Sequence, residues 1–395
     1  MSKPKLNVAM YGHGFMGRAH SNALRQVGYF FPEETPFEVV LHTVVGRRED
    51  AVEKFAREQG WQNWTTDPKY VFDNAEIHLV DVATSNDSHA DIAVSALEVG
   101  KHTLTEKPLS NTLQGASRMV QAAKTASDKG VHNAVWHNYR FTPAVVFALL
   151  QFITLIGKIL RFRAKYLQQW GDESCPRVWR FLKAICGSGA HGDLNAHIID
   201  LFVLLCQDEL ESVSGGYTQT VWQQRPNPEW NEKSADVPKT LASDVDDISL
   251  FNGRSKKGLI ATFEATRTSA GSNNDNLIEI DGTKGRLTWS LESLTELHWV
   301  DYTENKLTRG WKTIDVSQKG HPYVSNCWPE GHNIGYEHTF IFLLLEFLLK
   351  VAGQKPLHTD TFATIQSTMH TQRVLQASLL SAEQGGAKVD ISSIN

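Results

Sequence analysis

The chain has 395 residues, of which 41% are apolar and 21% are charged, and its formal net charge is −5. The length suggests roughly two or three domains, and the composition is typical of a globular protein with a hydrophobic core. The negative net charge and the absence of Lys- or Arg-rich runs argue against nucleic acid or an anionic membrane as the main partner.

Targeting signals are not apparent in the sequence. No uncharged apolar segment reaches the roughly 18 residues of a membrane span, and no signal-peptide pattern precedes the first expected strand. The four cysteines are far apart and show no C-x-x-C spacing. We therefore expect free thiols and a cytoplasmic protein with no membrane partner.

The first part of the chain alternates short apolar strands with helices. We expect strands at residues 8–11, 37–46, 76–84, 101–107 and 131–139. We expect helices at residues 18–27, 48–60, 88–100 and 113–130. This alternation predicts an α/β domain over residues 1–140, built on a parallel sheet that is covered on both faces.

The pattern changes after Thr142. A helix near 143–156 leads into a long strand and then a helix near 194–206, and two helices close the chain. Further strands are expected near 246–251, 259–266, 277–281 and 285–289. Grouped strands with helices to one side predict an α+β domain over residues 141–395, with a large, mostly antiparallel, open-faced sheet. The closing helices could pack back on the first domain, and the polar segment 223–243 is expected to be a long loop.

Three glycines follow the first strand and open the first helix. Gly12, Gly14 and Gly17 form G-x-G-x-x-G, in the context that a dinucleotide-binding motif requires. The first glycine makes the tight turn, the second lets the backbone approach a pyrophosphate, and the third packs helix against strand. The motif predicts a Rossmann domain that binds NAD(P), with Phe15 and Met16 also next to the cofactor; the alternative is that the glycines only build a turn.

The end of the second strand bears on the choice between NAD and NADP. An NAD enzyme usually carries an acidic residue there, which holds the ribose 2′-hydroxyl. Gly46 occupies that place, and Arg47 and Arg48 follow it. Two guanidinium groups could hold a 2′-phosphate, so the sequence favours NADP over NAD. Glu49 or Asp50 could still supply the acid in a shifted register, and the arginines could be solvated residues at a helix start.

Two motifs carry candidate proton-transfer residues. Lys107 lies in a Glu-Lys-Pro segment at the carboxyl end of the fifth strand, where ligands bind in such folds. Asp193 and His197 are four residues apart on one expected helix and share a face, so the carboxylate could orient an imidazole that titrates near neutrality. Each feature alone also fits surface residues. With His191 as the only other candidate ligand, we expect no metal site.

The chain resembles the sugar- and cyclitol-oxidising dehydrogenases of the glucose–fructose oxidoreductase, inositol dehydrogenase and rhizopine catabolism protein family. The resemblance covers nearly the whole chain and is carried by "GHGFMGRAH", "ATSNDSHADIAVSALEVGKHTLTEKPL", "HNYRFTPAV" and "GSGAHGDLNAHIIDL". Glu-Lys-Pro combined with G-D-x-x-x-H is far more specific than either motif alone. The segments 166–170 and 179–181 make the levoglucosan dehydrogenase-like branch the best match.

The resemblance implies a site residue by residue. It implies that the catalytic set is Lys107, Asp193 and His197. It implies that further cofactor-binding residues are Thr84, Asn86, His89, Glu106, Lys107 and Asn138. It implies that the substrate contacts Lys107, Tyr139, Arg140, Trp179, Arg180, Asp193, His197 and Tyr336.

These observations predict an NAD(P)-dependent dehydrogenase. It would oxidise a secondary hydroxyl of a sugar, glycoside, anhydrosugar or cyclitol to a ketone, or run the reverse reaction. The alternative is a non-catalytic sensor that binds nucleotide and sugar, but the presence of all three catalytic residues favours the enzyme. Because residues 277–300 carry apolar residues at both odd and even positions, and because family members pair through this sheet, we expect a homodimer or homotetramer.

Overall fold

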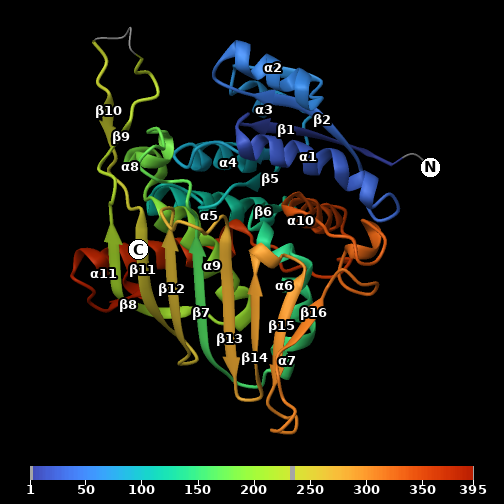
Figure 1. Ribbon diagram of the computed structural model, residues 1–395. Helices are drawn as coiled ribbons and strands as arrows, with labels where there is room; N and C mark the ends of the chain where they lie inside the picture. Colours follow the sequence, from blue (N-terminus) through green and yellow to red (C-terminus); the bar gives the residue numbers. More distant parts are fainter. Residues whose placement is uncertain (1–2, 232–235, 395) are drawn as a thin grey trace. The chain divides into compact units, whose positions relative to one another are not determined.

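The structure is a computed structural model that describes residues 3–231 and 236–394 (Figure 1). The chain divides into two compact units. The first unit comprises Met1–Ser110, Gln114–Val146 and Ser317–Met369. The second comprises Asn111–Leu113, Phe147–Val316 and His370–Asn395. The predicted boundary between two domains at residue 140 remains a prediction.

The first unit contains a six-stranded parallel sheet with the strand order β3-β2-β1-β4-β5-β6. Its strands are β1 (Lys5–Tyr11), β2 (Glu38–Val45), β3 (Asn63–Thr65), β4 (Leu79–Val82), β5 (His102–Thr105) and β6 (Asn133–Val135). This order and direction confirm the predicted α/β Rossmann sheet. The three-residue β3 was not expected from the sequence, because so short a strand shows no apolar periodicity.

Helices of the first unit come from both ends of the chain. They are α1 (Phe15–Phe30), α2 (Glu49–Gln59), α3 (Tyr70–Asp73), α4 (His89–Glu98), α5 (Leu113–Ser127) and α10 (Tyr336–Val351). The helix α10 contacts α1, although more than three hundred residues separate their first residues. Within α10, every side chain from His338 to Leu349 is buried.

The apolar helix α10 carries one buried carboxylate. Glu346 accepts hydrogen bonds from the hydroxyl of Tyr323 (2.8 Å) and from the backbone N–H groups of Leu357 (2.9 Å) and His358 (2.9 Å). Burial raises the pKa of Glu346, and these donors oppose that shift. Among the described residues, no helix is long and apolar enough to cross a membrane.

The second unit contains a nine-stranded sheet with the order β16-β15-β14-β13-β7-β12-β11-β8-β17. Its strands are β7 (Ile159–Leu167), β8 (Leu210–Gln219), β11 (Ile248–Ser255), β12 (Ile260–Thr266), β13 (Asp275–Gly282), β14 (Gly285–Ser290), β15 (Glu296–Asp301), β16 (Lys312–Asp315) and β17 (Val389–Asp390). Neighbouring strands are antiparallel except for β7 and β12, which are parallel. The mostly antiparallel sheet expected from the sequence is therefore confirmed.

The helices of the second unit include α8 (Lys183–Cys186), α9 (Ala196–Cys206) and α11 (Ile365–Glu383). The first five residues of α11 belong to the first unit. The chain enters this unit through α6 (Pro143–Phe147) and α7 (Ile153–Leu155). Helix α9 packs on β7, where the rings of Phe162 and Phe202 are 5.2 Å apart.

Successive side chains of β13, β14 and β15 point to opposite faces of the sheet. One face is buried and carries Ile278, Ile280, Leu287, Trp289, Leu297 and Trp299. On the opposite face, Glu279 pairs with Arg163 and Arg286. The expectation that residues 277–300 place apolar side chains on both faces therefore holds only for the partly buried Leu277 and Val300, which lie on this opposite face. The turn between β13 and β14 moves the buried positions from even to odd numbers, so a count across the turn mixes the two faces.

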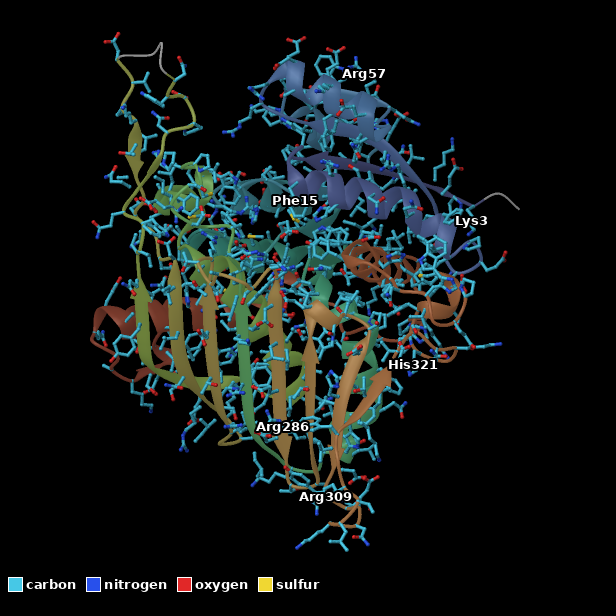
Figure 2. The ribbon with its side chains drawn as sticks, viewed as in Figure 1. Lys3, Phe15, Arg57, Arg286, Arg309 and His321 are labelled. Carbon is cyan, nitrogen blue, oxygen red and sulfur yellow. The ribbon has the colours of Figure 1, made fainter. Side chains whose placement is uncertain are left out.

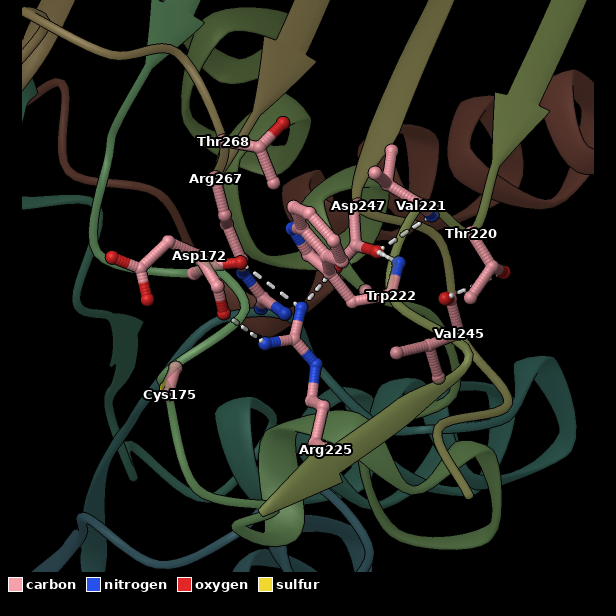
Figure 3. A network of polar contacts seen from close by, with 12 residues as sticks. Asp172, Cys175, Thr220, Val221, Trp222, Arg225, Val245, Asp247, Arg267 and Thr268 are labelled. Atoms are coloured by element: carbon pink, nitrogen blue, oxygen red, sulfur yellow. Dashed lines mark hydrogen bonds and ion pairs between the residues drawn. The ribbon is translucent and has the colours of Figure 1, made fainter. Parts of the chain in front are cut away.

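The segment 223–243 is more ordered than the predicted loop. Its β9 (Gln224–Pro226) and β10 (Thr240–Ala242) form an antiparallel two-stranded sheet, while residues 232–235 lie outside the described residues. At its base, the buried guanidinium of Arg225 forms an ion pair with Asp247 (2.7 Å), as Figure 3 shows. Neither the three-residue strands nor this ion pair leaves a periodic signal in the sequence.

Candidate active site

The glycine motif forms a tight turn between β1 and α1. Gly12 has a φ of +101°, and a Cβ there would lie 2.4 Å from the carbonyl oxygen of Ala83. A Cβ on Gly17 would lie 2.6 Å from the carbonyl oxygen of Gly12. Gly14 is the N-terminal cap of α1 and has open space around its Cα. This is the geometry in which helix amides face a pyrophosphate, so the turn fits a dinucleotide.

Phe15 and Met16 begin α1. The side chain of Phe15, which is labelled in Figure 2, is 66% exposed. Its ring stacks on that of Tyr336, with 6.4 Å between ring centroids. Tyr336 also lies 6.3 Å from the ring of Tyr139. The structure thus brings together one predicted cofactor-binding residue and two predicted substrate-binding residues.

The carboxyl end of β2 is crowded around Gly46. A Cβ on Gly46 would lie 2.6 Å from Nδ1 of His13, which occupies that space. Arg47 and Arg48 are exposed, and Glu49 and Asp50 lie in the first turn of α2. Burial lowers the pKa of His13, and the two guanidinium groups lower it further.

Glu106 and Lys107 follow β5. Glu106 belongs to a buried charged cluster with His20 and Asp81. His20 lies between Asp81 (Nδ1 to Oδ2, 3.0 Å) and Glu106 (Nε2 to Oε1, 3.2 Å). The other carboxylate oxygen of Glu106 accepts the backbone N–H of Lys107 (3.0 Å). The indole N–H of Trp136 donates to Asp81 (2.8 Å), and its ring stacks on His20. The cluster ties the backbone of Lys107 to the core of the sheet.

The charge state of His20 follows from its neighbours. Burial alone lowers the pKa of His20, but the carboxylates of Asp81 and Glu106 outweigh burial and raise it to about 9. Burial also raises the pKa of Glu106, yet the contacts with His20 and the charge of Lys107 bring it below its usual value. His20 is therefore an imidazolium near neutral pH.

A second histidine holds the residue after Lys107. His89, at the start of α4, lies between the carbonyl oxygens of Pro108 (Nδ1, 3.0 Å) and Thr84 (Nε2, 3.2 Å). Burial lowers its pKa. Asn86 lies in the same turn and is buried. The predicted cofactor residues around Lys107 thus belong to one connected part of the first unit.

Residues 138–141 form a buried 3-10 helix after β6. Asn138 donates to the hydroxyl of Thr339 (2.8 Å), and Arg140 donates to the carbonyl oxygen of Thr361 (2.7 Å). Tyr139 is also buried. All three residues, which the resemblance assigned to the site, pack against segments from the C-terminal part of the chain.

Asp193 and His197 lie in the second unit, whereas Lys107 lies in the first. The predicted single α-helix begins with a π-helical turn at His191–Asn195, and α9 continues from Ala196. His197 is buried, with its ring 5.7 Å from that of Tyr166. His197 therefore lies in an α-helix, whereas Asp193 lies in the wider π-helical turn that precedes it. The two residues are not part of one continuous α-helix.

Two arginines, Arg180 and Arg267, lie next to Asp193. The sequence pointed to Arg180 but not to Arg267. Oδ2 of Asp193 accepts a hydrogen bond from Arg267 (2.9 Å) and lies 4.0 Å from Nε of Arg180. Arg180 lies over the ring of Trp179, 4.3 Å from the ring centre. Arg267, like His20 and Asp81 in the first unit, was missed because no local pattern distinguishes it.

Comparison with known proteins identifies the family. The family model described as "Oxidoreductase family, NAD-binding Rossmann fold" matches residues 6–134, and the GFO/IDH/MocA C-terminal domain matches residues 154–288. The chain belongs to the Gfo/Idh/MocA family of oxidoreductases. It has an NAD-binding Rossmann domain, and its cofactor is a nicotinamide dinucleotide.

Individual relatives cover nearly the whole chain. Levoglucosan dehydrogenase from Pseudarthrobacter phenanthrenivorans is 36% identical over 88% of this chain and 89% of its own length. The solved structure of a levoglucosan dehydrogenase with NADH is 34% identical, with a TM-score of 0.88 over 98% of this chain and 99% of that one. An oxidoreductase domain protein from Kribbella flavida is 36% identical, with a TM-score of 0.90 over 99% of this chain and 100% of that one.

The buried His20 cluster predicts a pH-dependent contribution to stability. The folded pKa of about 9 exceeds the ordinary value of 6.5, so the stabilisation is fully present below pH 6.5 and is lost as the pH rises through about 9. We expect the difference in unfolding free energy between wild type and His20→Gln to shrink by roughly 3 kcal/mol across this range. Denaturant unfolding at several pH values measures it. Exposed His332→Gln is the control, and a gap that stays constant with pH would contradict the assignment.

Proposed function

We propose that this protein oxidises a secondary hydroxyl of a sugar, anhydrosugar or cyclitol to a ketone, or catalyses the reverse reduction. The proposal is carried by the three candidate proton-transfer residues, each held by buried neighbours in a chain of this oxidoreductase family. Relatives named as levoglucosan dehydrogenase and, in Bacillus subtilis, as scyllo-inositol 2-dehydrogenase (NAD(+)) support it; the second is 28% identical over 60% of this chain and 61% of its own length.

The proposed roles follow from residue chemistry. His197 or Lys107 takes the proton of the substrate hydroxyl, and Asp193 orients the imidazole or the hydroxyl. A nicotinamide held by the cofactor-binding residues would supply the hydride acceptor, and loss of hydride from the carbon that bears the hydroxyl leaves a ketone. Trp179 and Tyr336 offer aromatic faces to the apolar faces of a sugar ring, and Arg180 offers donors to its hydroxyl oxygens.

The same reasoning assigns the remaining site residues. We propose that the substrate also contacts Tyr139 and Arg140. We propose that the cofactor lies against Gly12, Gly14, Phe15, Met16, Gly17, Thr84, Asn86, His89, Glu106, Lys107 and Asn138. The open space at Gly14 supports the placement of phosphates there, because the backbone amides of α1 can be approached closely.

A substrate panel tests the proposed activity. Levoglucosan, glucose, myo-inositol and scyllo-inositol are each incubated with NAD⁺ and with NADP⁺, and formation of the reduced nicotinamide is followed by absorbance. We expect turnover of at least one alcohol. Lys107→Ala and His197→Ala should each lower kcat by roughly 10²–10⁴ while cofactor binding is retained, since general acid–base catalysis contributes that much.

Matched surface variants control for this experiment. Lys129 and His332 are exposed, and Lys129→Ala and His332→Ala should leave kcat unchanged. Near wild-type turnover in His197→Ala would remove His197 from the mechanism. Binding of sugar and nucleotide without any turnover would favour a sensor over an enzyme.

For the cofactor, we propose a preference for NADP over NAD. The crowded Gly46 and the exposed Arg47 and Arg48 support it, although the solved levoglucosan dehydrogenase complexes contain NADH. Replacing both arginines with Ala should raise the Kd of NADP⁺ by about tenfold or more per residue, because each charge-assisted bond is worth roughly 1.5–3 kcal/mol. Isothermal titration calorimetry measures the Kd of NADP⁺ and that of NAD⁺. Arg57→Ala, an exposed change on α2, is the control, and equal losses for NAD⁺ and NADP⁺ would refute the preference.

For assembly, we propose a homodimer or homotetramer that associates through the large sheet. The family resemblance supports this. Leu250 and Ile260 support it as well, because they stay 40% and 52% exposed on the sheet face opposite the buried Phe251 and Phe263. A second copy could cover them with an interface above roughly 1,000 Å². Light scattering at micromolar concentration should give a multiple of 44.2 kDa, and a monomer mass would overturn the proposal.

A further inference from the structure

Arg267 is a buried cation directly after β12. Its side chain is 1% exposed, so its charge and its N–H groups depend on protein partners. One terminal nitrogen donates to Oδ2 of Asp193 (2.9 Å), and the other donates to the carbonyl oxygen of Arg180 (3.2 Å). A single guanidinium thus joins the π-helical turn of Asp193 to the segment that contains Trp179 and Arg180.

The position of Arg267 is fixed on several sides. Its guanidinium carbon lies 5.1 Å from the ring centre of Trp170 and 5.8 Å from that of Phe181. Its backbone N–H donates to the carbonyl oxygen of Asp247 (3.1 Å), and its carbonyl oxygen accepts from the backbone N–H of Gly171 (2.8 Å). A Cβ on Gly171 would lie 2.8 Å from the Cβ of Arg267, so the backbone of Gly171 packs closely against Arg267.

A second buried arginine, Arg225, offers a comparison. Figure 3 labels Arg225 and Arg267 in the same network of polar contacts. Arg225 forms its ion pair with Asp247 (2.7 Å), donates to the carbonyl oxygens of Gly171 and Asp172, and lies 3.7 Å from the ring centre of Phe181. The two arginines have similar burial and similar neighbours, but only Arg267 has Asp193 as its carboxylate partner.

We infer that Arg267 is a positioning residue of the reaction, which acts through Asp193. This inference rests on the proposed function, because the catalytic part of Asp193 is itself proposed. The hydrogen bond from the guanidinium to Oδ2 restricts the rotation of the Asp193 carboxylate. Misplacing a reacting group by about 1 Å can cost roughly a hundredfold in rate. An arginine suits this task better than a lysine, since its planar fork holds two acceptors at once.

Four variants test this role: Arg267→Lys, Arg267→Gln, Asp193→Asn and the double variant Arg267→Gln/Asp193→Asn. With levoglucosan, or the panel alcohol that wild type turns over fastest, Arg267→Gln should lower kcat by roughly tenfold to a hundredfold. KM and the cofactor Kd should change less than about threefold. Arg267→Lys should recover part of the lost kcat. In the Asp193→Asn background the change at Arg267 should have little further effect, because residues that act as one unit are not additive.

Arg225→Lys is the matched control. It changes a guanidinium of equal burial whose carboxylate partner is Asp247, so it should lower the unfolding free energy but keep kcat within about threefold. Rates are taken per folded enzyme, with folding checked by circular dichroism; if Arg267→Gln does not fold, Arg267→Lys and Arg267→Lys/Asp193→Asn replace it. Losses that add in the double variant would overturn the role of Arg267. A wild type that turns over none of the panel alcohols would overturn the proposed function and this role with it.

Discussion

Buried charge that must be compensated is the constraint on which both units depend. An isolated charge loses several kcal/mol of hydration in the interior, so it persists only beside a partner of opposite sign or several donors. In the first unit, the imidazolium of His20 lies between Asp81 and Glu106. In the second, Arg225 and Arg267 each have a carboxylate partner.

These buried pairs explain why the candidate site residues are well defined. Glu106 is held by His20 and in turn accepts the backbone N–H of Lys107, so the segment that carries the proposed catalytic amine is fixed from the core. Asp193 is held by Arg267 in the same way. Removing one partner of such a pair is far more damaging than exchanging both, because it leaves a charge without compensation. The same groups therefore compensate buried charge and fix the segments that carry the candidate site residues.

The open sheet of the second unit uses charge differently. On its exposed face, Arg161 pairs with Asp281 across neighbouring strands, and Arg163 and Arg286 both contact Glu279. The arginines of these pairs are partly exposed, whereas Glu279 is buried. These pairs make the face polar between its exposed apolar residues, which suits a surface that is stable in water before any association.

The sequence alone determined the features that depend on a few neighbouring residues. The turn of Gly12, Gly14 and Gly17 was predictable because backbone sterics within one β-α unit require glycine, and the parallel sheet was predictable because its strands are apolar throughout. The Glu-Lys-Pro and Asp-x-x-x-His segments could likewise be recognised from neighbouring residues. They are the basis on which Lys107, Asp193 and His197 were predicted as site residues.

Only the tertiary structure decided which partners those residues have. His20 and Asp81 are 61 positions apart, and Arg267 and Asp193 are 74 apart, so no periodicity connects them. The buried face of β13 to β15 was also hidden, since the turn between β13 and β14 shifts the alternation by one residue. Local sterics act along the chain and leave a pattern in it, whereas the compensation of a buried charge is set by segments that meet only when the chain has folded.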